Sequence, residues 1–180
     1  MPLADQTPLS SFPLRRYTSR ELPAYRHIPG YSPHPVRDEA GHSFQRVEGP
    51  QVCPLGYGRW RDCGDYLYGV DLFNHSFFWE AHEVWEPIWH EVGHESASGR
   101  FVQALIQMAA VMLLHRSERF GGIPKLLQRA TKNVRLARER GAGDERALYG
   151  LDMSRWQRRV RAYLSEGDVV RFPYLELEGL

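Results

Sequence analysis

The chain is poor in several features that would identify a class of protein directly. It has two cysteines, Cys53 and Cys63, in 180 residues. They are too few for a disulfide-rich scaffold and lack the C-x-x-C spacing of a zinc knuckle or redox pair, so we expect free thiols. The longest apolar run, residues 104–114, is interrupted by Gln107, and the N-terminus lacks the apolar segment of a signal peptide. We therefore expect a cytoplasmic protein without membrane association.

An excess of charge of one sign is also missing. The 23 basic and 22 acidic side chains give a net charge of +1, so we do not expect a nucleic acid or an anionic membrane as partner. The charges are nevertheless unevenly distributed. Residues 71–95 hold six acidic and no Lys or Arg residues, whereas residues 125–161 hold eleven basic and four acidic ones. We interpret these segments as two solvated helix faces, with a nucleic-acid surface as the alternative.

The alternation of apolar and polar residues that a half-buried strand requires is absent, and helical periodicity begins at residue 65. The pattern predicts helices over residues 65–74, 77–92, 100–116, 124–140 and 152–164, with Ser76 capping the second. Nine of the twelve prolines lie in residues 1–60. We predict an all-α fold: a compact bundle of about five helices over residues 61–180 with an extended C-terminal tail, and an extended Pro-rich N-terminal arm, residues 1–60, packed on it.

Residues 90–94 read HEVGH, which matches the zinc-metallopeptidase signature H-E-x-x-H. In that signature two histidines bind one zinc ion and the glutamate polarises the bound water. Here His90 falls opposite the apolar arc of its helix, Gly93 ends the helix inside the motif, and Pro87 removes a helical hydrogen bond. We interpret the motif as a hydrophilic helix end, and a zinc metallopeptidase through His90, Glu91 and His94 is an alternative.

A second polar group borders the apolar arc of residues 77–92. His82 and Glu86 are one turn apart, so the carboxylate can orient the imidazole. Gln103 and Gln107 share a stripe of the apolar helix 100–116, with His115 two turns beyond. If the two helices face each other through these edges, they form a polar pocket, for which the candidate residues are Trp79, Glu80, His82, Glu83, Glu86, Gln103, Gln107 and His115. A polar network that only fixes helix register is the competing interpretation.

No motif identifies a reaction. The chain has no G-x-S-x-G elbow, no phosphate-binding glycine loop and no paired Glu-x-x-His repeat of a di-iron bundle. We expect no cofactor and no resident metal. The main hypothesis is a binding module for a small molecule or a protein, and the alternative is a metal-assisted hydrolase using His82 and nearby carboxylates. Stoichiometric metal retained through purification would favour the hydrolase.

Three strings carry a resemblance to a known family: LFNHSFFWEAHEVWEPIW, RFVQALIQMAAVMLLH and GIPKLLQRA, within residues 65–135. They resemble the bacterial and archaeal family catalogued as domain of unknown function 309, and the arm strings LPAYRHIPGYSPHP and GHSF resemble an N-terminal extension of its longer members. The resemblance implies a helical bundle with no established activity. Its pattern falls on Trp79, Glu80, His82, Glu83, Trp85, Glu86, Trp89, Gln103 and Gln107. Ser76 and Ala104 stand where the family commonly has glycine, and Pro87 where it has a helix former.

Overall fold

The computed structural model describes residues 14–45, 55–141, 147–167 and 171–179. It contains α1 (Gly64–Asn74), α2 (Phe78–Val92), α3 (Ala97–Arg116), α4 (Ile123–Glu139) and α5 (Met153–Glu166), with short 3-10 helices at Tyr57–Asp62 and Phe120–Gly122. No strand occurs within these described ranges. The predicted all-α class is confirmed.

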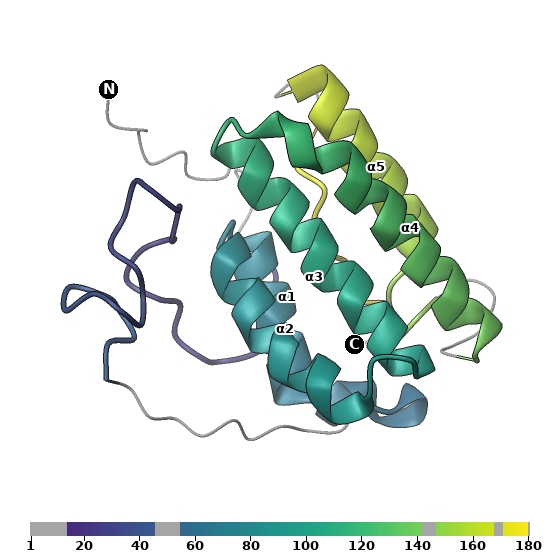
Figure 1. Ribbon diagram of the computed structural model, residues 1–180. Coiled ribbons are helices and arrows are strands. Elements are labelled where there is room, and N and C mark those ends of the chain that lie inside the picture. Colours follow the sequence, from purple (N-terminus) through teal and green to yellow (C-terminus); the bar gives the residue numbers. More distant parts are fainter. Residues whose placement is uncertain (1–13, 46–54, 142–146, 168–170, 180) are drawn as a thin grey trace.

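Helix α3 is the central element of the bundle. It packs against α2 on one side and α4 on the other, and Figure 1 shows it between these two helices. Its residues Phe101, Leu105 and Met108 are completely buried. Among the described helices, α3 alone is also long and apolar enough to cross a bilayer. The buried central helix of a bundle has the same composition, because neighbouring helices cover it on several sides.

Helices α1 and α2 approach each other closely at Gly69. A Cβ atom at Gly69 would lie 2.0 Å from Nε1 of Trp85, an indole that is fully buried. This indole N–H donates a hydrogen bond of 3.3 Å to the carbonyl oxygen of Tyr66 in α1. The glycine therefore makes room for the largest side chain of the interface between the two helices.

The turn between α1 and α2 depends on an unusual backbone conformation. Ser76 has a φ of +65°, in the left-handed region that favours glycine. The expected capping role of Ser76 is wrong, because the N-cap of α2 is Phe77 and no side chain caps this helix. Helix α3, in contrast, begins three residues earlier than predicted, because Ser96 accepts the backbone N–H of Gly99 and caps it.

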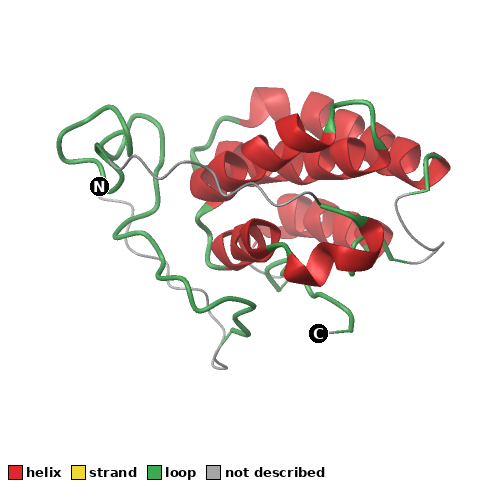
Figure 2. Cartoon of the chain, turned by 90° about the horizontal axis from the view of Figure 1, so that it is seen from below, coloured by secondary structure: helices red, strands yellow, loops and turns green. Residues whose placement is uncertain are grey.

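The described parts of the arm and the tail lie on the outside of the helices. Figure 2 shows the arm beside the bundle, and Figure 1 places it on the side of α1 and α2. The C-terminal tail is anchored more deeply than expected, because Leu175 and Leu177 are buried. Cys63 is disulfide-bonded. The expected free thiol is therefore wrong for Cys63, and the same expectation for Cys53 falls outside the described residues.

Candidate functional site

The strongest polar anchor of the arm is Asp71, whose side chain on α1 is inaccessible to solvent. Its Oδ1 accepts the backbone N–H of Tyr17 at 2.8 Å, and its Oδ2 accepts the backbone N–H and the hydroxyl of Thr18 at 2.9 and 2.7 Å. Nε of Arg16 lies 3.3 Å from Oδ2. Burial of a carboxylate is tolerated only when charge-assisted hydrogen bonds replace water. Asp71 obtains these bonds entirely from the arm.

Asn74, one turn further along α1, holds the C-terminal tail. Its side-chain oxygen accepts the backbone N–H of Leu175 at 2.7 Å, and its amide nitrogen donates to the carbonyl oxygen of the same residue at 2.9 Å. The backbone N–H of Leu177 donates to the hydroxyl of Tyr17 at 3.0 Å. The two extended segments thus meet on one face of α1.

Glu80 is the third side-chain acceptor of this face and lies in the first turn of α2. It is 4% exposed. Its Oε1 accepts the backbone N–H of His27 at 2.7 Å and lies 3.2 Å from Nε2 of His42. Its Oε2 is buried without a hydrogen-bond partner among the described residues. Both histidines belong to the arm, so the arm covers this carboxylate.

Burial raises the pKa of Glu80 to about 7. The hydrogen bond from the His27 backbone and the positive charge of Arg26 oppose this rise, whereas the negative charge of Glu83 adds to it. Desolvation dominates because both hydrogen bonds reach Oε1, whereas Oε2 is buried without a partner among the described residues. Glu80 is therefore close to its titration midpoint near neutral pH.

Trp79 lies beneath two further arm side chains. Its indole makes edge contacts with the rings of His27 and His34, at centroid distances of 5.0 and 5.4 Å. Burial, followed by the charge of His34, lowers the pKa of His27. These arm residues were not among the candidates that the sequence indicated. The available signal was that three of the eight histidines fall in the proline-rich residues 27–42.

His82, Glu83 and Glu86 form a separate group on the more exposed side of α2. One ligand atom from each lies within 4.8 Å of the others, and this is the one group of at least three potential metal-binding side chains in the described residues. Nδ1 of His82 lies 3.3 Å from a carboxylate oxygen of Glu83, and these side chains are 32% and 42% exposed. Imidazole and carboxylate ligands in this arrangement suit a divalent transition metal.

The polar stripe of α3 faces α4 rather than α2. Oε1 of Gln107 accepts from Nδ2 of Asn133 at 3.1 Å, and Arg100 donates to Oδ1 of Asn133 and to Oε1 of Gln103 at 3.2 and 3.4 Å. His115 lies at the other end of α3 beside Phe120 and Tyr163. The expected convergence of the eight residues in one pocket is therefore corrected: they occupy separate places, and Gln103 and Gln107 belong to a network between α3 and α4.

The HEVGH motif spans the end of α2. The helix ends at Val92, and Gly93 has a φ of +79°. His90 and His94 are exposed, their Nδ1 and Nε2 atoms lie 3.0 Å apart, and His94 stacks on Trp89. No third described side chain joins them in a potential metal site. A zinc ion at this place would lack the third protein ligand that catalytic sites use.

Residues 66–126 match the model of a family described as "Domain of unknown function (DUF309)". The match confirms the resemblance seen in the sequence. It includes Asp71, Asn74 and Glu80, whereas the arm and the tail that they hold lie outside it. No curated protein matches the chain.

Proposed function

We propose that this chain, which belongs to the DUF309 family through residues 66–126, binds an extended polypeptide segment on the face formed by α1 and the first turn of α2. The observation that carries the proposal is the buried carboxylate of Asp71, which receives two successive backbone N–H groups from a segment more than fifty residues away in the sequence. In the present state the occupant of this face is the chain's own arm.

The chemistry of the face suits recognition of main chain rather than of particular side chains. Asp71 and Glu80 accept backbone N–H groups, and Asn74 pairs with both the N–H and the carbonyl of one residue. Backbone groups are strong donors and acceptors in every sequence, so such a face can hold any extended chain whose side chains fit around it.

The arm is held mainly through polar contacts. Among its described residues 14–45, only His27, Ile28 and Pro35 are buried. Tyr17 and Leu22 also pack against the hydrophobic core, but they are only partly buried. The hydrophobic contribution is therefore confined to a few arm side chains, because it scales with the apolar area removed from water. A segment held in this way can be exchanged for a similar segment of another protein.

The proposal is tested by cutting the arm from the folded protein. A specific protease site is introduced between residues 46 and 50, the full-length protein is cleaved after purification, and a labelled peptide of residues 14–45 is added. We expect the cleaved arm to remain associated and to exchange with the labelled peptide in a saturable reaction. The bundle's helical circular dichroism is recorded in parallel.

Asp71→Asn should weaken peptide binding at least about tenfold, because a neutral acceptor replaces charge-assisted bonds. Asp62→Asn is the matched control, since Asp62 is an exposed carboxylate whose ion pair is with Arg59 of its own short helix. The affinity of this control variant for the peptide should stay within about twofold of that of the original protein. Complete loss of the arm from a bundle that stays folded, with no peptide binding up to about 1 mM, would refute the proposal.

The grouping of His82, Glu83 and Glu86 favours a second candidate, a metal-assisted hydrolase. Three protein ligands with an open position would allow a divalent ion to lower the pKa of bound water. Equilibrium dialysis of the full-length protein against zinc or manganese tests this candidate. Stoichiometric binding should be lost in His82→Ala and retained in His90→Ala. Equal binding by the two variants, or none by the original protein, would eliminate it.

A further inference from the structure

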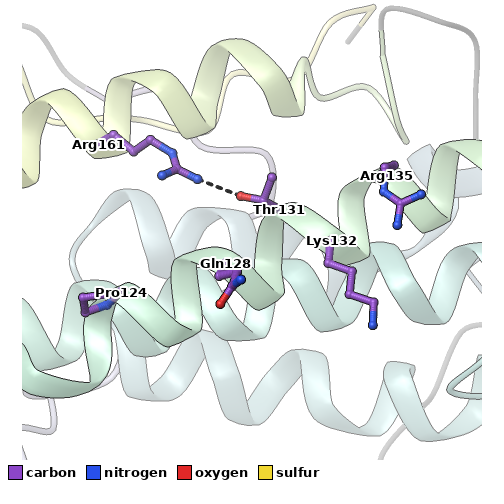
Figure 3. Close-up of a pocket in the computed structure, with 6 residues that line it drawn as sticks. All are labelled: Pro124, Gln128, Thr131, Lys132, Arg135 and Arg161. Carbon is purple, nitrogen blue, oxygen red and sulfur yellow. Dashed lines mark hydrogen bonds between the residues drawn. The ribbon is translucent and has the colours of Figure 1, made fainter.

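A hollow with a volume of about 410 Å³ lies between α4 and α5 (Figure 3). None of its lining residues belongs to α1 or α2, the helices that hold the arm. Five of the lining residues come from α4 and one from α5: Pro124, Gln128, Thr131, Lys132, Arg135 and Arg161. Three of these six side chains are cationic, and no carboxylate is among them. The lining therefore concentrates positive charge at this place.

The guanidinium of Arg161 is hydrogen-bonded across the hollow. It donates a hydrogen bond of 2.8 Å to Oγ1 of Thr131, and Figure 3 shows this bond joining α5 to α4. The Thr131 hydroxyl donates in turn to the carbonyl oxygen of Leu127 at 2.8 Å. A guanidinium has five N–H donors, and this arrangement occupies one of them. The remaining N–H groups of the Arg161 guanidinium are available to bind an anion.

The two other cationic side chains of the lining, Lys132 and Arg135, both belong to α4. Arg135 pairs with Glu139 at 2.6 Å, but both side chains are at least half exposed, so solvent weakens this pair. Lys132 makes neither a hydrogen bond nor an ion pair in the part of the chain that the structure describes. Three neighbouring cations that share one exposed carboxylate partner, Glu139, repel one another, and a bound anion relieves this repulsion.

We infer that this hollow is a binding site for the diphosphate group of a small molecule. Arginine presents parallel donors that match phosphate oxygens, and lysine adds a compact charge. Three cationic side chains balance a diphosphate better than a single phosphate, because a single phosphate carries only about −1.5 to −2 charge units. The hollow is open to solvent, and Pro124 and Gln128 line the part of it beside the cations, where a nucleoside attached to the diphosphate would lie.

Isothermal titration calorimetry of the full-length protein at low ionic strength tests the inference. The probes are inorganic pyrophosphate, a nucleoside diphosphate and a single-stranded oligonucleotide. We expect pyrophosphate and the nucleoside diphosphate to bind saturably at one site. Equal affinities would assign recognition to the diphosphate alone, whereas tighter binding of the nucleoside diphosphate would show that the nucleoside is also bound.

Arg161→Gln and Lys132→Gln should each weaken binding at least about tenfold, since each removes a charged hydrogen-bond donor. Arg129→Gln and Arg158→Gln are matched controls, because they remove the same charge from exposed positions of α4 and α5 outside the hollow. The dissociation constants of the two control variants should stay within about twofold of that of the original protein. Equal losses in all four variants, binding of the oligonucleotide alone, or no binding up to about 5 mM would overturn the inference.

Discussion

Replacement of Glu80 by glutamine should change how stability depends on pH. The pKa of Glu80 is raised from its ordinary value of 4.5 to about 7, chiefly by burial. The difference corresponds to roughly 3 kcal/mol of unfavourable free energy when the buried group is ionised. Glutamine has nearly the same shape as the protonated carboxyl, so its side-chain oxygen can still accept the His27 N–H.

The direction in which stability changes with pH follows from comparing the pKa of Glu80 in the folded and unfolded states. Because the folded-state pKa lies above the unfolded one, the folded protein binds the extra proton between pH 4.5 and about 7. The favourable contribution of Glu80 is fully present below pH 4.5 and is lost as the pH rises through about 7. The charged or titratable groups that face Glu80 come from the arm, α1 and α2, and they are Arg26, His27, His42, Tyr68 and Glu83.

Urea denaturation monitored by circular dichroism, repeated from acidic to mildly alkaline pH, measures the effect. The free energies of unfolding of the original protein and of Glu80→Gln should be similar at pH 4.5. The variant should become more stable as the pH rises, by up to roughly 3 kcal/mol at about pH 8. Titratable groups that do not face Glu80 cancel in the difference between the two proteins. A difference that stays constant over this range would refute the reasoning, because Glu80 would then titrate at its ordinary pKa.

Four further substitutions test the fold and the side chains around the site. Ser76→Gly should stabilise the protein by about 0.5–1 kcal/mol in thermal denaturation, because glycine relieves the positive φ; a lower melting temperature would contradict this. Gly69→Ala should destabilise it by at least about 2 kcal/mol, since its Cβ would overlap the indole of α2; a neutral result would show that α1 and α2 can separate. Gln107→Met should cost about 1–2 kcal/mol by leaving the Asn133 amide without its acceptor, and stabilisation would instead favour a polar site maintained for a ligand. His90→Ala should change stability by less than about 0.5 kcal/mol, and a loss of bound zinc in this variant would restore the metallopeptidase interpretation.

The helices were largely predictable from the sequence, because their signals are local. Apolar periodicity placed α2 and α4 to within a residue or two, and proline content located the extended arm. The position of Gly93 indicated that the HEVGH motif would fall at a helix end, where the structure has it. The resemblance to the family marked Trp79 and Glu80 as residues of interest, but it did not identify their neighbours.

The partners of the polar side chains were not predictable in the same way. Periodicity showed that Gln103 and Gln107 share a stripe of α3, but a central helix has several neighbours, and the pattern does not say which of them the stripe faces. The structure turns this stripe toward Asn133 of α4. The pocket expected between α2 and α3 was wrong for this reason.

The sequence by itself determined the helical elements, the extended arm and the uneven distribution of charge, because each depends on residues close together in the chain. Only the tertiary structure decided that Asp71 and Glu80 hold the arm, since their partners lie more than fifty residues away. It also decided that Glu80 titrates near neutrality, because a carboxyl's pKa depends on the burial and hydrogen bonds that distant segments impose on it.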